Sequence, residues 1–238
     1  MQKRNFIICF FVIVTGMLYL TACGGETGKS TLKEGEIPEL VEVGSNSIHE
    51  TADIINNFTH LHFNKEYLDD NYIDMIYEVK GEEDIEGEKT EKIYVKIDFL
   101  NSHSSGYEYD FWVTDSGEVP QAYSYESDYM NKVNGDEILD EVLEYFVEPF
   151  DYFDDTYREA LQEGLWSIRE MEVEKDQVAG HDVKVHSYYG KHDITFDDEA
   201  EFNLVILEFD DFELTLESED TTAFGTNQRY EIKEMKRR

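Results

Sequence analysis

Apolar and polar residues alternate over several stretches of this chain, at the spacing typical of half-buried β-strands. Residues 93–99 place isoleucine, valine and phenylalanine at every second position, separated by Tyr94, Lys96 and Asp98. Residues 107–113 repeat the alternation after a polar turn, so the two stretches predict an antiparallel hairpin. Residues 202–209 are almost continuously apolar and residues 212–217 alternate again, which predicts a buried strand followed by a neighbour.

Other stretches carry apolar residues at helical spacing. Residues 47–58 begin with Ser47 and Glu50, the spacing of a capping box, and predict the first helix. Residues 134–148 carry a second apolar stripe, which Pro149 is expected to end at Glu148 or earlier. A short helix is expected over residues 156–164.

The order of these elements predicts the fold class. Each half of the chain has a helix followed by strands, so we expect an α+β body in which helices pack on an antiparallel β-sheet, with two similar halves. At the level of architecture this is similar to cystatin-like or NTF2-like folds, an analogy that carries no function.

The N-terminus has the layout of a secretory signal peptide. Lys3 and Arg4 precede an uncharged apolar run from Phe6 to Leu20, and small residues follow the run. A membrane-spanning helix needs about 20 apolar residues, so this run is too short to be a good permanent span. We therefore expect a leader that is removed.

The end of the leader, Leu20-Thr21-Ala22-Cys23, resembles the lipobox of bacterial lipoprotein precursors. The resemblance implies cleavage between Ala22 and Cys23, and a diacylglycerol on the Cys23 thiol that carries fatty acyl chains such as palmitate. It also implies attachment to the extracytoplasmic face of the cell membrane. The alternative is an ordinary signal peptide followed by a chance cysteine.

The sequence divides into a signal peptide over residues 1–22 and a lipidated cysteine with a flexible tether over 23–39. Two α+β halves over 40–130 and 131–238 follow. The tether is assigned because residues 24–39 are polar, glycine-rich and free of periodic apolar positions. Cys9 leaves with the leader, so a lipidated mature chain has no pair of thiols for an internal disulfide.

The charge of the chain limits its partners. The formal net charge is −35, and removal of Lys3 and Arg4 with the leader takes it to −37. A body of this charge repels nucleic acid, which is excluded as a partner, and attracts cations and basic peptides. Aromatic residues make up 14% of the chain, so the carboxylates are expected to coat a folded domain.

A concentration of aromatic residues is the best candidate for a binding surface. Tyrosine and tryptophan are favoured at interfaces because they combine a large contact area with a polar group. The candidate patch lies on two adjacent expected strands and consists of Tyr107, Tyr109, Trp112, Tyr123 and Tyr125. Half-buried packing of the same residues within a sheet is the alternative.

No other residues form a recognisable catalytic or metal-binding motif. The histidines, His60 and His62 among them, lack metal-ligand spacing, and no Gly-x-Ser-x-Gly elbow is present. We expect no cofactor and no metal. The expected function is a membrane-anchored lipoprotein that binds a surface protein or a cationic ligand and is not an enzyme. A surface hydrolase of envelope polymers with paired carboxylates and a divalent-cation-binding protein are the alternatives.

Overall fold

The computed structural model describes residues 28–31, 40–41, 44, 46–67, 71–101, 105–126, 129–163, 166–192, 201–220 and 227–238. The expected leader, the cleavage site at Ala22 and the acylation site at Cys23 lie outside these residues. In the described part of the chain, no helix has the length and apolar character needed to cross a bilayer.

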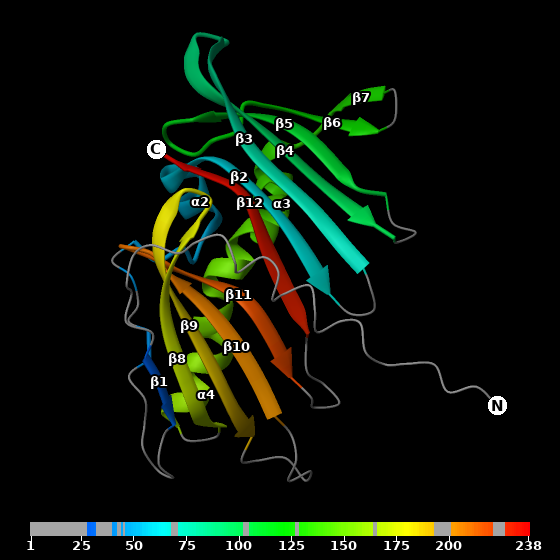
Figure 1. The fold of residues 1–238 in the computed structure, drawn as a ribbon. Coiled ribbons are helices and arrows are strands. Elements are labelled where there is room, and N and C mark those ends of the chain that lie inside the picture. The colour runs from blue at the N-terminus through cyan, green and yellow to red at the C-terminus, as the bar shows by residue number, and fades with distance from the viewer. Residues whose placement is uncertain are drawn as a thin grey trace, which may run out of the picture.

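The strands join edge to edge in one antiparallel sheet, in the order β1-β8-β9-β10-β11-β12-β2-β3-β4-β5-β6-β7 (Figure 1). The first seven in chain order are β1 (Gly28–Thr31), β2 (Phe58–Tyr67), β3 (Asn71–Ile85), β4 (Glu88–Leu100), β5 (Tyr107–Thr114), β6 (Gln121–Glu126) and β7 (Tyr129–Lys132). The remaining strands are β8 (Trp166–Val178), β9 (His181–His192), β10 (Glu201–Glu208), β11 (Glu213–Asp220) and β12 (Gln228–Arg237).

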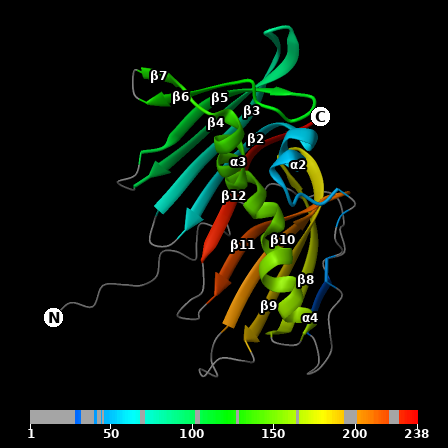
Figure 2. The ribbon, with the colours of Figure 1, turned by 180° about the vertical axis from the view of Figure 1, so that it is seen from behind.

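Helical residues are fewer and lie in two places. The short helix α2 (Thr51–Asn57) leads directly into β2, and the long helix α3 (Gly135–Tyr152) crosses one face of the sheet from the β6 side to the β8 side (Figure 2). It continues as a π-helical segment, η1 (Phe153–Arg158), and a single turn, α4 (Glu159–Gln162).

The expected α+β architecture of two helix-then-strands halves is therefore wrong. One twelve-stranded sheet dominates the fold, and β12 from the C-terminal range pairs with β2 from the N-terminal range. Helix-then-strand order along the chain did not reveal this pairing, because the contacts that join strands distant in sequence leave no local pattern. The boundary at residue 130 stays a prediction, and the sheet runs across it.

The sheet has a narrow joint between β11 and β12. Among the described residues their register covers two pairs, Glu217↔Arg229 and Ser218↔Gln228, whereas the register of β12 with β2 extends over most of both strands. On the α3 side of β2 near this joint, the Lys65 ammonium donates to both carboxylate oxygens of Glu148 at 2.6 Å. The long helix thus ties the strands on the two sides of the joint together.

Part of the expected tether is also structured. Residues Gly28–Thr31 form β1, which pairs with β8 from Gly28↔Val173 to Thr31↔Glu170. For these four residues the expectation of a free tether is wrong, because the backbone completes the edge of the sheet. The rest of the tether, residues 23–27 and 32–39, lies outside the described residues.

The β3–β4 hairpin is long and includes a highly charged stretch. The charged stretch after Gly81 continues β3 to Ile85, and a two-residue turn at Glu86 and Gly87, with φ of 55° and 92°, starts β4. Positive φ at both positions is the geometry of a tight turn that matches strand twist. A glutamate in that conformation is uncommon, so the residue types did not signal the turn.

The helix ends also differ from expectation. Helix α2 begins at Thr51 with Glu50 as its N-cap, paired with Asp53 in a capping box, and Ser47 lies before the helix. Helix α3 runs through Pro149 to Tyr152, because the buried side chains around the proline hold the following turn in place. Tertiary packing here outweighs the local helix-breaking preference.

Two apolar cores lie beneath the helix. Phe146 of α3 packs against Phe63 and Tyr77 of the sheet, with ring centroids 6.5 Å and 6.2 Å away. The second core lies under η1 and includes Tyr157 and Phe202, whose ring centroids are 6.0 Å apart. The helix therefore shields one face of the sheet in both regions, and the opposite face of β2–β6 carries mainly polar residues.

Candidate functional site

Exposed large apolar side chains gather at one corner of the sheet. In the described part of the chain they are Leu100 at 47%, Tyr107 at 38%, Tyr129 at 74% and Met130 at 58% exposure. Leu100 ends β4, Tyr107 begins β5, and the other two begin β7, so all four lie at the same end of adjacent strands. Strand alternation places Tyr107 and Tyr129 on the α3 face and Leu100 and Met130 on the opposite face, so this corner is apolar on both faces.

A cleft lies at this corner, where β5 and β6 diverge. Their pairing begins at Tyr109↔Ser124, beyond the first two residues of β5. The opening encloses about 470 Å³, and we call it the corner cleft; it is lined by Asp98, Ser105, Gly106, Tyr107, Glu108, Tyr109, Ser124, Tyr125 and Glu126. Position 106 requires glycine, because a Cβ atom there would lie only 2.3 Å from the carbonyl oxygen of Ile97.

The structure divides the candidate aromatic patch between two faces. Tyr107 and Tyr109 lie on the α3 side, where their stacked rings are 6.3 Å apart. Trp112 lies on the opposite side, is 6% exposed, and packs edge-on against Tyr123 at 5.8 Å. Successive strand residues point to opposite faces, so five aromatics on two strands do not form one surface.

The corner cleft nevertheless brings three of the five together. Tyr107 and Tyr109 line it from one face of the sheet, and Tyr125 lines it from the other. Trp112 and Tyr123 are absent from the lining and belong to a packed cluster. The sequence reasoning missed the carboxylates of the cleft, Glu108 and Glu126, although both adjoin tyrosines of the patch in the sequence.

Burial and nearby carboxylates raise the pKa of two tyrosines of the cleft. Tyr125 donates to Asp110 at 2.6 Å, and partial burial together with this bond raises the pKa of Tyr125 to about 12. Burial, with the nearby Tyr107 and the charges of Glu141 and Glu126, also raises the pKa of Tyr109. Tyr109 and Tyr125 therefore carry no charge at neutral pH, and the carboxylates supply the negative potential.

Cations already lie on aromatic rings beside the cleft. The Lys92 ammonium lies 4.7 Å from the ring centroid of Trp112 and 2.8 Å from Asp110. The Lys80 ammonium lies 5.0 Å from the ring centroid of Tyr94. This face of the sheet thus holds ammonium groups between an aromatic ring and a carboxylate, an arrangement that stabilises cations.

Comparison with protein families, with curated proteins and with solved structures found no match to this chain. The assignment of a function therefore rests on the geometry of the chain itself.

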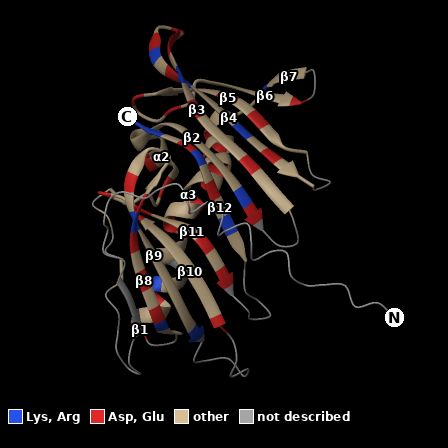
Figure 3. Cartoon of the chain, viewed as in Figure 1, with Lys and Arg blue, Asp and Glu red and all other residues tan. Residues whose placement is uncertain are grey.

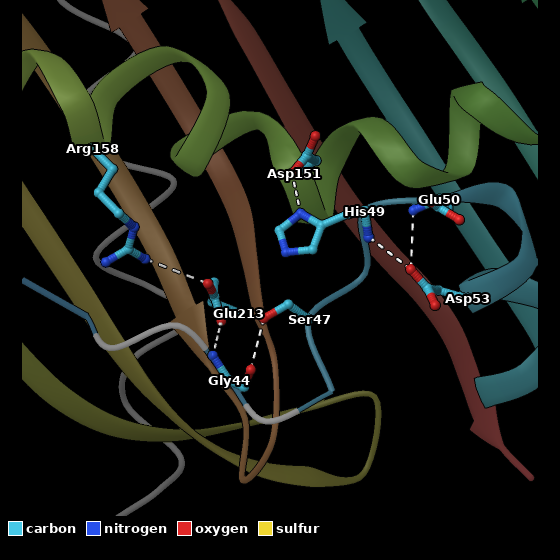
Figure 4. A network of polar contacts seen from close by, with 8 residues as sticks. All are labelled: Gly44, Ser47, His49, Glu50, Asp53, Asp151, Arg158 and Glu213. Atoms are coloured by element: carbon cyan, nitrogen blue, oxygen red, sulfur yellow. Dashed lines mark hydrogen bonds and ion pairs between the residues drawn. The ribbon is translucent and has the colours of Figure 1, made fainter.

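A second polar network lies at the start of the first half and is shown in Figure 4. His49 contacts the Asp151 carboxylate through Nδ1 at 2.5 Å, and the Gly44 amide donates to Glu213, which also accepts from Arg158. The Ser47 hydroxyl donates to the Gly44 carbonyl at 2.7 Å, so its proton is directed away from His49. The network ties the segment before α2 to α3 and β11, and it lacks the hydroxyl-to-imidazole bond that nucleophilic catalysis requires.

Three further histidines, His60, His62 and His186, each contact one carboxylate. His62 contacts Asp74 at 2.8 Å, and His60 lies 3.3 Å from Glu234. Across the residues that the structure describes, no three histidine, cysteine, aspartate or glutamate side chains converge to hold a metal ion. The divalent-cation alternative therefore has no ligand set in this part of the chain.

A second hollow of about 360 Å³ lies between α2, the β3–β4 hairpin and the turn after β5. The Arg238 guanidinium occupies one side of it, donating to both carboxylate oxygens of Glu91 at 2.8 Å and 2.6 Å and to the carbonyl of Ile55. The basic residues at the C-terminus thus fold against the acidic body. This pairing satisfies the main charges of the hollow, which makes the corner cleft the better candidate.

The described carboxyl groups do not favour hydrolytic chemistry. Wherever their pKa is shifted it is lowered, as at Glu91 and Asp211, where hydrogen bonds from Arg238 and Arg237 stabilise the ionised form. A glycosidase needs one carboxylic acid with a raised pKa as its general acid. Acidic residues are instead spread over the strands of both halves (Figure 3).

One buried histidine predicts a pH dependence of stability. His186 is 8% exposed, its Nε2 contacts Glu208 at 2.6 Å, and burial lowers its pKa despite that carboxylate. Between its lowered pKa and about 6.5, the unfolded state binds a proton that the folded state does not. The free energy of unfolding is therefore expected to fall as pH drops below about 6.5, as measured by urea midpoints.

The matched variant is His186→Gln, which keeps a donor for Glu208 and removes the titration. Its midpoints should depend less on pH between 7.5 and 5 than those of the unmodified protein. A slope identical to that of the unmodified protein would show that His186 is not held neutral in the folded state. His60, whose pKa burial also lowers, accounts for part of the slope that remains.

Proposed function

We propose that this protein is a membrane-anchored extracytoplasmic lipoprotein whose acidic body binds a cationic ligand in the corner cleft. The observation that carries the binding role is the cleft itself, which combines three tyrosines with the carboxylates of Asp98, Glu108 and Glu126. The anchoring role rests on the resemblance of residues 20–23 to a lipobox.

The composition of the cleft favours an ammonium or guanidinium group. A cation over an aromatic face gains about 0.5–1 kcal/mol at an exposed site and about 2 kcal/mol or more when desolvated. Glu126 forms no ion pair with other described residues, whereas Asp98 is paired with Lys96 at 2.7 Å. The cleft therefore offers aromatic surface and at least one carboxylate for a cation supplied by a ligand.

The charge of the whole body supports the same choice. A formal charge of −37 after removal of the leader draws basic ligands toward the surface and speeds their encounter. Screening limits this attraction to about 8 Å at physiological salt, so short-range contacts in the cleft must supply the specificity.

The position of the cleft suits a site that faces away from the membrane. β1 and β7 are the two ends of the strand order, about 50 Å apart for a flat sheet at ~4.8 Å per strand. Cys23 is five residues before Gly28 of β1, a reach of at most ~18 Å. An anchor on Cys23 would hold the β1 edge near the bilayer. Strand β7, which adjoins the corner cleft, lies at the opposite edge of the sheet (Figure 1).

The binding role is tested by calorimetric titration of residues 23–238, carrying Cys23→Ser, with decalysine. Tyr107→Ala is expected to weaken binding about three- to tenfold, and Tyr107→Phe should retain it because the ring remains. Tyr189→Ala is the matched control, since Tyr189 also adjoins a carboxylate, Glu201, but lies on β9.

Two further results decide the outcome. Glu126→Gln should weaken decalysine binding, and the difference between the cleft variants and the control should persist as the salt concentration is raised. If decalysine binds equally to the cleft variants and to Tyr189→Ala, the attraction is that of a general polyanion. The corner cleft would then not be the site.

A further inference from the structure

The strand beside the corner cleft, β7, is a free edge of the sheet. It pairs with β6 on one side, and it is the last strand in the sheet order. All four of its residues are exposed, including Tyr129 at 74% and Met130 at 58%. An exposed edge strand that carries large apolar residues is a template for pairing with another extended chain.

The register shows which backbone groups the edge offers. Val133 donates its amide hydrogen to the carbonyl of Ala122 at 3.1 Å, continuing the β6–β7 register in which Lys132 is opposite Tyr123. Hydrogen-bonded and non-hydrogen-bonded pairs alternate along an antiparallel ladder. Tyr129 and Asn131 therefore bond to β6, and the amide and carbonyl groups of Met130 and Lys132 point away from the sheet.

The side chains along β7 connect this edge to the cleft. Met130 is opposite Tyr125, and Tyr129 is opposite Glu126, both of which line the corner cleft. A strand added outside β7 would lie about 4.8 Å beyond β7, and so two strand spacings, roughly 10 Å, from Tyr125 and Glu126 of β6. Its side chains would alternate between the Met130 face and the Tyr129 face.

We propose that an extended basic peptide adds to β7 as the next strand of the sheet. This inference rests on the proposed binding of a cationic ligand and names the form in which the ligand binds. Main-chain hydrogen bonds to Met130 and Lys132 supply affinity, and a long basic side chain reaches across β7 toward the Glu126 carboxylate on β6. Lys132 is the one positive charge on β7, and it repels basic side chains of the peptide. The peptide is therefore expected to pair in the register that places its basic residues near Tyr129 and Glu126, at the other end of β7.

Charge distinguishes this occupant from a second copy of the chain. Two copies joined at β7 would bring two bodies of formal charge near −37 together, with a Glu126 in each beside the new interface. Like charges oppose that association, and a basic peptide is complementary to the same surface.

The test compares two ligands on the mature chain with Cys23→Ser. One is an eight-residue peptide of alternating lysine and valine, and the other has the same sequence with N-methyl groups on alternate backbone nitrogens. The charges are equal, and only the first can pair fully along a strand edge. The unmethylated peptide is expected to bind at least tenfold more tightly, and equal affinities would overturn strand addition.

A variant of the edge separates this inference from the proposed function. Met130→Pro removes an amide that points away from the sheet, a position where proline is tolerated. It should weaken binding of the lysine–valine peptide at least tenfold and leave binding of spermine, a polyamine cation with no peptide backbone, little changed. If Met130→Pro has no effect on the peptide and Tyr107→Ala weakens it, the cleft binds cations without strand addition.

The remaining outcomes are also decisive. If neither variant changes the binding of either probe, both the cleft and the added strand are excluded. If sedimentation shows dimers that Met130→Pro abolishes, the edge pairs with a second copy of the chain. That result would overturn the proposal that a basic peptide binds there. Should Met130→Pro fail to fold, as judged by its melting temperature, the methylated and unmethylated peptides still decide the question on the unmodified edge.

Discussion

Replacing Cys23 by alanine is expected to release the protein from the membrane fraction of its cells. Two acyl chains on one thiol give a stable anchor, whereas the apolar run of residues 6–20 is short for a membrane span. Without the thiol neither acyl chain can be attached. The measurement is an immunoblot of membrane and soluble fractions, together with mass spectrometry of the N-terminal peptide for the acyl groups.

Cys9 provides the matched control, because it is the other cysteine of the chain and lies within the leader. Cys9→Ala should leave the protein in the membrane fraction with Cys23 acylated. A Cys23→Ala protein that remains in the membrane fraction with its leader intact would show that the apolar segment is the anchor. The ordinary signal peptide is supported instead if the unmodified protein is cleaved, carries no acyl group and is found outside the membrane.

The sequence predicted individual strands better than it predicted the sheet. Alternation over residues 93–99 and 107–113 corresponds to β4 and β5, which pair as an antiparallel hairpin with Ile97 opposite Tyr107. The tight turn at Glu86 and Gly87 was missed, because a glutamate at positive φ is atypical and the surrounding charges resemble a loop. These charges are tolerated because the hairpin tip is exposed to solvent and because opposite charges on its two strands pair, as Lys89 does with Glu82.

The pairing of β12 with β2 could not be found from local patterns. It joins residues near the C-terminus to residues near position 60, and each strand alone looks like an ordinary half-buried segment. The fold class was wrong for this reason, since two halves that look separate in sequence share one sheet. Pairing information of this kind is carried by complementary surfaces, which a single sequence does not display.

The binding patch shows what strand alternation adds to composition. Tyr107, Tyr109 and Trp112 fall within six residues, but the change of parity between Tyr109 and Trp112 places the tryptophan on the other face. The division of the aromatic residues between two faces follows from the sequence once the strand is assigned. The cleft cannot be predicted in this way, because it forms where β5 and β6 stop pairing.

Phe146→Ala is expected to lower the free energy of unfolding by about 3–5 kcal/mol, the usual cost of removing a buried aromatic ring. The Phe146 side chain is fully buried, and its ring lies between α3 and the sheet, against Phe63 and Tyr77. The cavity left by alanine cannot be filled without moving the helix. Since domains are stable by about 5–15 kcal/mol, urea unfolding should show a large shift of the midpoint.

The matched control is Glu144→Ala, an exposed position on the same helix, where the change should stay within about 0.5 kcal/mol. The two tryptophans report on different parts of the sheet, since Trp112 is on β5 and Trp166 begins β8. Because α3 spans both parts and the β11–β12 register is short, removal of Phe146 should shift the fluorescence midpoint of both tryptophans together. A shift confined to Trp112 would mean that the strands on either side of the joint unfold independently, and equal small losses in both variants would show that α3 does not pack on the sheet.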